Sequence, residues 1–182
     1  MKLPALPAEY SASLVRSDGD RSRIALRSDR RRVETEFKNG QRHIVITRGD
    51  LGVGWIWQNF DPWLETPLDL RAVAAVADPS LGLSWRAVGD IEIDGQVCRH
   101  FVGSQVESGG TVQDCFVLPN GIRRRTVTYC ADGTVGLTID TVDATVGPPP
   151  LDVFDLPAGA AVLRVGRRRS EGRGGGPGST RQ

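Results

Sequence analysis

The sequence predicts a mainly β domain: a strongly curved antiparallel sheet, or incomplete β-barrel, of about nine or ten strands that one short helix covers. Three observations predict this class. Apolar and polar residues alternate through most of the 182-residue chain, as they do in half-buried strands. Turn-forming clusters such as Lys38-Asn39-Gly40 separate the alternating segments. A helical spacing of apolar residues is convincing only in residues 68–77.

The first half of the chain predicts five strands. A hairpin joins the third and fourth around Asn39-Gly40, a pair that tolerates the positive φ of a tight turn. The fifth strand carries the most regular apolar stripe of the chain. Residues 59–67 follow with two prolines, so we expect a crossing loop there. The predicted strands are residues 10–16, 21–27, 31–37, 41–48 and 51–58.

The second half predicts the helix and five further strands. Asp69 can cap the helix at its start, and Pro79 ends it. In the last strand the apolar residues change face after Ile139, and a bulge near Asp140 would explain the change. The predicted strands are residues 83–88, 91–101 with an interruption at Asp94-Gly95, 111–118, 122–130 and 134–146.

Composition divides the chain into an N-terminal stub (1–8), a folded domain (9–163) and a basic, Arg- and Gly-rich tail (164–182) that we expect to be disordered. Six of the 23 basic residues but only one of the 22 acidic residues lie in the tail, so the rest of the chain has a net charge of −4. That charge does not suit binding along a phosphate backbone, and we expect no nucleic-acid partner. The tail favours at most peripheral contact with an anionic membrane.

The stub is too short and too rich in proline to be a full signal peptide, although it resembles the join that follows a removed one. No run of 18 apolar residues predicts a membrane-spanning helix. The residues alone therefore leave the compartment open.

We expect neither catalysis nor a cofactor. The chain has two histidines, His43 and His100, and lacks the short motifs of serine hydrolases, zinc proteases and nucleotide-binding loops. His100 and the three cysteines lack the paired spacing of a structural zinc site, so no metal site is predicted. An enzyme with an unfamiliar motif stays the less favoured alternative.

Cys98 and Cys115 are candidates for a cross-strand disulfide. The two are directly opposed if the chain turns at residues 106–107, and about four residues out of register if it turns at residues 108–110. Buried free thiols are the alternative.

Two further patterns have a structural and a functional interpretation. The runs Arg30-Arg31-Arg32 and Arg123-Arg124-Arg125 stand at strand starts and are typical of solvated strand edges. The tryptophans either fill a core or line an apolar cavity for a lipid chain, in which each buried methylene contributes about 0.8 kcal/mol. The candidate cavity residues are Leu51, Val53, Trp55, Trp57, Trp63 and Trp85.

The order of several short motifs resembles the periplasmic lipoprotein-carrier superfamily, the LolA/LolB-like half-barrels. The resemblance spans about residues 9–160. The residues that carry it are Tyr10-Ser11-Ala12, Arg48-Gly49-Asp50 before Val53-Gly54-Trp55, and the segments 93–101, 117–122 and 154–159.

This resemblance implies an exported protein with an unclosed β-barrel wrapped over a helix. It implies a location in the periplasm or cell envelope, and a concave face that binds a lipid, an acyl chain or an acylated protein. The alternative is a structural or protein-interaction module that binds no small ligand, with a cytoplasmic location as the alternative compartment. The sequence specifies neither the ligand nor the oligomeric state.

Overall fold

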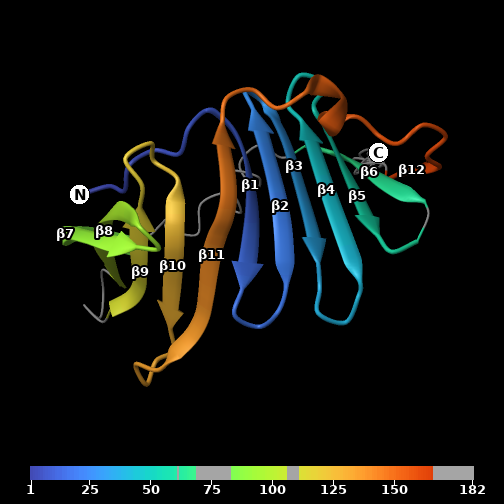
Figure 1. The fold of residues 1–182 in the computed structure, drawn as a ribbon. Coiled ribbons are helices and arrows are strands. Elements are labelled where there is room, and N and C mark those ends of the chain that lie inside the picture. Colours follow the sequence, from blue (N-terminus) through green and yellow to red (C-terminus); the bar gives the residue numbers. More distant parts are fainter. Residues whose placement is uncertain (61, 69–82, 106–110, 166–182) are drawn as a thin grey trace, which may run out of the picture.

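The structure is a computed structural model that describes residues 1–60, 62–68, 83–105 and 111–165. These residues form a single twelve-stranded sheet (Figure 1). The strands are β1 (Glu9–Arg16), β2 (Arg21–Arg27), β3 (Arg30–Glu36), β4 (Arg42–Arg48), β5 (Val53–Gln58), β6 (Trp63–Pro67), β7 (Leu83–Ile93), β8 (Gln96–Gln105), β9 (Thr111–Val117), β10 (Arg123–Tyr129), β11 (Val135–Val146) and β12 (Val162–Arg164), and a short 3-10 helix, η1 (Leu151–Phe154), precedes β12.

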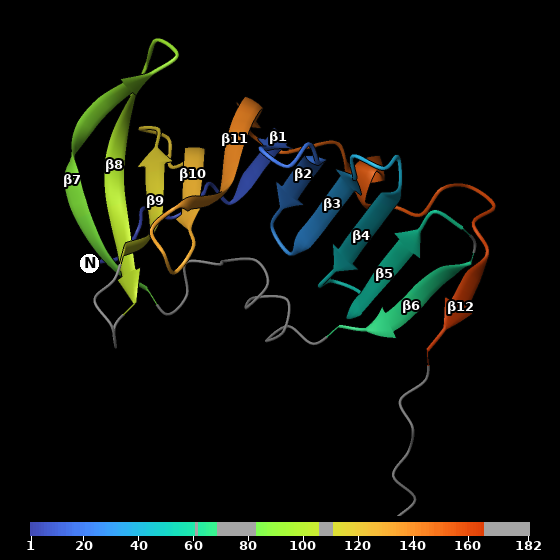
Figure 2. The ribbon, with the colours of Figure 1, turned by 90° about the horizontal axis from the view of Figure 1, so that it is seen from below.

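The sheet order is β12-β6-β5-β4-β3-β2-β1-β11-β10-β9-β8-β7. Neighbouring strands are antiparallel except β12 and β6, which are parallel. The sheet bends into an arch and does not close, with β7 and β12 as its two edges; η1 lies on the outer, convex side (Figure 2). The predicted class, a mainly β protein with a curved and unclosed antiparallel sheet, is therefore confirmed. The predicted helix, residues 68–77, lies almost entirely outside the described residues.

Local turn chemistry explains the hairpins. At the β3–β4 turn, Gly40 adopts a φ of 82° and its N–H donates to the Phe37 carbonyl at 2.8 Å. The predicted bulge of the last strand is also present. Ser13 of β1 faces Asp143, but Leu14 faces Thr141, so Val142 is the extra residue. The bulge thus lies two residues beyond the predicted position and carries the change of face along β11.

Three expectations about strands are corrected. Residues 63–67 form β6 rather than a crossing loop, because Pro67 lies at the end of a five-residue strand near the sheet edge, where a missing N–H is tolerated. Residues 162–164 form β12, so the sheet has twelve strands rather than nine or ten. The interruption predicted at Asp94-Gly95 is the turn between β7 and β8, whereas the predicted break at residues 89–90 lies within β7, which only bulges between Ala87 and Gly89.

Strand register assigns side chains to the two faces of the sheet. Ile46 pairs with Trp55, and both belong to a buried cluster against which Leu156 and Ala160 pack. Since η1 and the segment after it cover this cluster, it lies on the outer face (Figure 2). Residues at odd offsets from Ile46, such as Thr47, point to the inner, concave face.

No helix within the described ranges is long and apolar enough to cross a membrane.

Candidate ligand-binding face

An apolar row crosses the inner face at right angles to the strands. Each member pairs with the next across adjacent strands from β11 to β5, which at about 4.8 Å per strand gives a row about 24 Å long. We call it the inner row. Its members are Ala144, Ala12, Ile24, Val33, Val45 and Ile56.

The rows on either side are more polar. One joins hydroxyl and amide side chains, in which the Ser22 and Thr35 hydroxyls lie 3.0 Å apart and His43 faces Gln58. The other places Arg31 between Leu26 and Thr47. The inner row is thus an apolar strip with hydrogen-bonding groups along both sides.

Most of the inner row is only half-buried. Ala12 is buried, whereas Ile24, Val33, Val45 and Ile56 keep part of their surface accessible. Half-buried valine and isoleucine on a concave surface are typical of a face that accepts an apolar molecule, since a filled core buries such side chains completely.

The inner face continues to the other end of the sheet through a second apolar cluster. Trp85, Phe101, Cys115 and Val117 are each at most 5% exposed. Trp85 packs over Gly103, where an added Cβ would lie 2.8 Å from the indole ring. Glycine at this position therefore lets the tryptophan ring approach the backbone of β8 closely.

The N-terminal segment packs on this same face. Leu3 packs against the Trp85 cluster, and Leu6 packs against a third cluster of Tyr10, Ala12 and Ile122. The Met1 amino group donates to the Trp85 carbonyl at 3.4 Å. Residues predicted as a stub therefore form part of the described fold.

The structure does not bring the six predicted cavity residues together. Trp55, Trp57 and Trp63 lie with Val53 in the outer cluster, where the Trp57 and Trp63 ring centroids are 6.3 Å apart. Leu51 lies in the turn before β5 and is 55% exposed.

Of the six, only Trp85 is on the inner face. The prediction of a single cavity lined by all six residues is therefore wrong. The stripe on β5 was identified correctly as one face, but alternation within one strand does not say whether that face is concave or convex.

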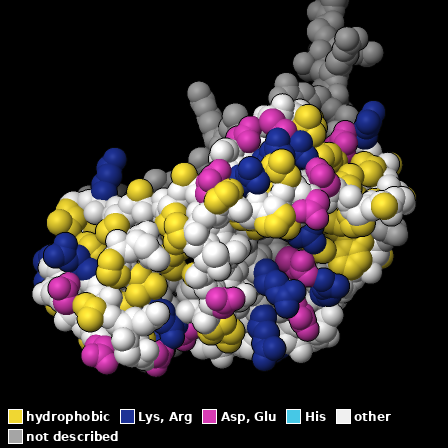
Figure 3. Space-filling model, turned by 45° about the horizontal axis from the view of Figure 1, so that its top comes forward, with side chains coloured by type: hydrophobic (Ala, Val, Ile, Leu, Met, Phe, Trp, Pro, Cys, Tyr) yellow, Lys and Arg dark blue, Asp and Glu magenta, His cyan; other side chains and the backbone are white. Residues whose placement is uncertain are grey.

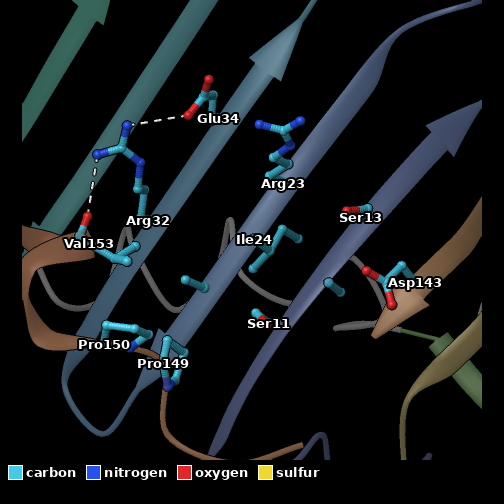
Figure 4. Close-up of a pocket in the computed structure, with 12 residues that line it drawn as sticks. Ser11, Ser13, Arg23, Ile24, Arg32, Glu34, Asp143, Pro149, Pro150 and Val153 are labelled. Atoms are coloured by element: carbon cyan, nitrogen blue, oxygen red, sulfur yellow. Dashed lines mark hydrogen bonds and ion pairs between the residues drawn. The ribbon is translucent and has the colours of Figure 1, made fainter. Parts of the chain in front are cut away.

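The segment that follows β11 lies across the outer face. The guanidinium of Arg27 donates to the Pro149 carbonyl at 2.9 Å, and that of Arg32 donates to the Val153 carbonyl at 3.3 Å. A cavity of about 360 Å³ remains beneath this segment, with Ser11, Ser13 and Arg23 on the sheet side (Figure 4).

Basic and acidic side chains alternate on the molecular surface (Figure 3). On the outer face, Glu34 is held by both Arg32 and Arg42. Burial acts to raise the pKa of Glu34, but the hydrogen bonds from Arg42 and Arg32 outweigh burial and lower this pKa. Because Arg32 also donates to the Val153 carbonyl, this ion-pair network lies directly beneath the segment that covers the outer face.

The predicted disulfide between Cys98 and Cys115 is wrong for this fold. Both thiols are free and buried, and Cys115 pairs with Phe101, three residues along β8 from Cys98. Three residues correspond to about 10 Å along a strand, more than the roughly 7 Å that a disulfide spans between α-carbons. The alternative of buried thiols holds for Cys98 and Cys115, while Cys130 is exposed.

Within the described ranges, no group of three or more His, Cys, Asp or Glu side chains is arranged to hold a metal ion. His100 stacks on Phe116 with ring centroids 4.5 Å apart, and its Nε2 lies 3.3 Å from Asp114 Oδ1. Tyr129 donates its hydroxyl to the same carboxylate at 2.6 Å. That hydrogen bond, together with burial, raises the pKa of Tyr129 to about 12.

The comparisons with known proteins bear on the fold. No protein-family model matches the chain, and no curated protein matches its sequence. A solved structure of an uncharacterized conserved protein from Thermus thermophilus superimposes with a TM-score of 0.65 at 14% identity, over 88% of this chain and 92% of that chain.

The MucA/MucB complex of Pseudomonas aeruginosa gives a TM-score of 0.54 at 15% identity, and this chain covers only 58% of that chain. A LolA superfamily protein from Nitrosomonas europaea is also among the matches, with 10% identity over 86% of this chain and 92% of that chain; its TM-score of 0.33 is too low to argue from. The chain therefore has the open, curved β-sheet fold of the Thermus and Pseudomonas proteins.

Proposed function

We propose that this protein is a non-catalytic binding protein of the cell envelope whose inner face holds an apolar chain, such as the acyl chain of a lipid or of an acylated protein. One observation carries the proposal. The inner row is apolar across six strands, yet Ile24, Val33, Val45 and Ile56 stay half-buried. Such a strip gains free energy when an apolar molecule removes it from water.

The energetic scale is sufficient without any catalytic group. Burying about ten methylenes at about 0.8 kcal/mol each contributes about 8 kcal/mol before the cost of ordering the ligand. The row is about 24 Å long, which suits a long extended chain better than a compact ligand. The fold shared with the Thermus and Pseudomonas proteins is consistent with this function.

The experiment is a titration of the purified protein with a fluorescent long-chain fatty acid, after native mass spectrometry has established whether an apolar molecule co-purifies. The test variant carries Val33→Thr and Val45→Thr, which keep the side-chain shape and the strand preference but place two hydroxyls in the inner row. We expect a dissociation constant at least about tenfold higher, because each hydroxyl must lose water without gaining a partner.

The matched control is Val142→Thr. Val142 is the bulged residue of β11, is 57% exposed and borders a groove on the outer face. The Val142→Thr substitution should leave the affinity for the fatty acid unchanged. Saturable binding that is equal in all three proteins would place the ligand elsewhere, and absence of binding to the native protein would refute the acyl-binding function.

A protein-interaction module is the second candidate, and one observation favours it. β7 is an eleven-residue edge strand, and Val88, Ile91 and Val97 of the β7–β8 hairpin are each about half exposed. An edge of this length can pair with an extended segment of another protein. The bulge in β7 and the Asp90–Arg99 ion pair work against such pairing, so we rank this candidate second. Failure of acyl binding in the titration would favour it.

A further inference from the structure

Three consecutive arginines of β3 have three different environments. Arg30 pairs with Asp50 at 3.1 Å, and Arg32 pairs with Glu34 at 3.2 Å. Arg31 points to the opposite face from Arg32, between Leu26 and Thr47. Within the described part of the chain, Arg31 makes no hydrogen bond or ion pair, although it is half-buried.

A half-buried guanidinium without a partner is unfavourable. It loses part of its hydration on a largely apolar face, and no carboxylate compensates for the loss. Arg30 and Arg125 of the same sheet avoid this cost by pairing with Asp50 and Asp140. The position of Arg31 is therefore typical of a residue whose partner is not part of the protein.

One arginine of the second run, residues 123–125, also lies on the inner face. Arg123 pairs with Val117, which belongs to the inner-face cluster of Trp85. Arg124 instead bonds to Asp94 and Arg125 to Asp140. Each run thus contributes one arginine, Arg31 or Arg123, to the inner face.

Tyr10 lies between the two inner arginines. It is 7% exposed, packs with Ile122 and lies in the same cross-strand row as Leu26 and Arg31. Burial raises the pKa of Tyr10, and the positive charges of Arg31 and Arg123 act in the opposite direction, as they do only when both guanidinium groups are near the phenol. Its hydroxyl makes no hydrogen bond to another described residue.

We propose that Arg31 and the Tyr10 hydroxyl, with the positive charge of Arg123 nearby, form an anion subsite at the side of the inner row, which binds the phosphate or carboxylate head group of an amphiphilic ligand. The subsite rests on the proposed function, because the inner row supplies the place for the attached chain. A guanidinium group and a hydroxyl are both hydrogen-bond donors. Hydrogen bonds to an anion are stronger than hydrogen bonds between two neutral groups. A head group of this charge gives the ligand an orientation that an apolar strip alone does not impose.

The test compares ligands that share one chain length and differ only in the head group: a fatty acid, an alkyl phosphate and the corresponding fatty alcohol. Affinities for native protein and Arg31→Gln are measured by isothermal titration calorimetry. We expect native protein to bind both anions at least about tenfold more tightly than the alcohol, and Arg31→Gln to lose that preference while it keeps its affinity for the alcohol. A larger preference for the phosphate than for the carboxylate would identify the head group as phosphate.

The matched control is Arg23→Gln. Arg23 is an exposed arginine on the neighbouring strand β2, borders the outer cavity and also makes no hydrogen bond or ion pair within the described residues. It should keep the preference for anions, which excludes a general effect of net charge. Tyr10→Phe is the second variant and should weaken binding of the anions several-fold but not of the alcohol.

Thermal unfolding separates the subsite from a structural role. Removing an unpaired charge should leave the melting temperature of Arg31→Gln equal or higher. Equal affinity of the native protein for the anions and the alcohol would overturn the subsite and leave the proposed function intact. Loss of binding to all three ligands by the native protein would overturn the proposed function itself.

Discussion

At the residue scale, identical side chains have different roles because the sheet gives each a different environment. Arg30, Arg31 and Arg32 are adjacent in sequence, yet two are paired with acids and the third lies on the inner face without one. The three cysteines also differ, since Cys98 and Cys115 are buried and Cys130 is exposed. The amino-acid composition gives the number of arginines and cysteines but not their different environments in the fold.

The cysteines give a prediction that checks the strand register. In the native protein, iodoacetamide should alkylate Cys130 rapidly, and Cys98 and Cys115 only after denaturation. Burial raises the pKa of the Cys98 thiol, which lowers the fraction of reactive thiolate. Mass spectrometry counts the modified residues. Only one alkylated cysteine in denatured, unreduced protein would mean that a disulfide joins the other two and that the register of β8 and β9 is incorrect.

At the scale of elements, Asp114 of β9 connects its two neighbouring strands. It accepts the Tyr129 hydroxyl from β10 at 2.6 Å and lies 3.3 Å from His100 of β8. The three strands lie next to the β7 edge of the sheet (Figure 2). Cross-strand polar pairs of this kind contribute to strand alignment.

Tyr129→Phe tests this connection. The pKa of Tyr129 is about 12 in the folded protein and about 10 when unfolded, so the protonated phenol stabilises the fold below pH 10 and its contribution is lost as pH rises towards 12. We expect the variant to lose about 1 kcal/mol of unfolding free energy at pH 8, with a smaller difference from native protein at pH 11. Urea denaturation at the two pH values measures both. Tyr10 is unchanged in both proteins, so an equal difference at the two pH values would mean that the Tyr129 hydroxyl is not bonded to Asp114.

At the scale of the whole molecule, the two faces of the arch have different tasks. The outer face is partly covered by the chain itself, through η1, Leu156 and Ala160. The inner face keeps a half-buried apolar row between polar rows. A sheet with a buried cluster on one side and an accessible apolar row on the other can be stable and still bind a ligand, because the two properties depend on different residues.

Phe154→Ala tests this division. Phe154 is fully buried in η1 on the outer face, so its loss should lower the free energy of unfolding by about 3–5 kcal/mol. Leu151→Ala in the same turn removes a side chain that is 49% exposed and should change stability by less than about 0.5 kcal/mol. Urea denaturation measures stability, and the fatty-acid titration measures binding. Below the unfolding transition, Phe154→Ala should keep native affinity for the acyl ligand; a weaker affinity would show that the two faces are coupled.

Sequence patterns alone determined most of the strands, the tight turns, the bulge of β11 and the unclosed curved sheet. These features depend on alternation and on turn residues such as Gly40, which act over a few positions of the chain. The short strands β6 and β12 were not predicted, because the pairing of each with its neighbouring strand specifies it more than its own sequence pattern does. Tertiary structure alone decided the rest.

Curvature made the β5 tryptophan stripe convex, and register placed Cys115 opposite Phe101 rather than Cys98. The same register aligned the inner row across six strands and left Arg31 beside it. Alternation within one strand defines two faces but cannot say which face is concave or which residues from distant strands become neighbours. Those outcomes follow from the pairing and bending of the whole sheet.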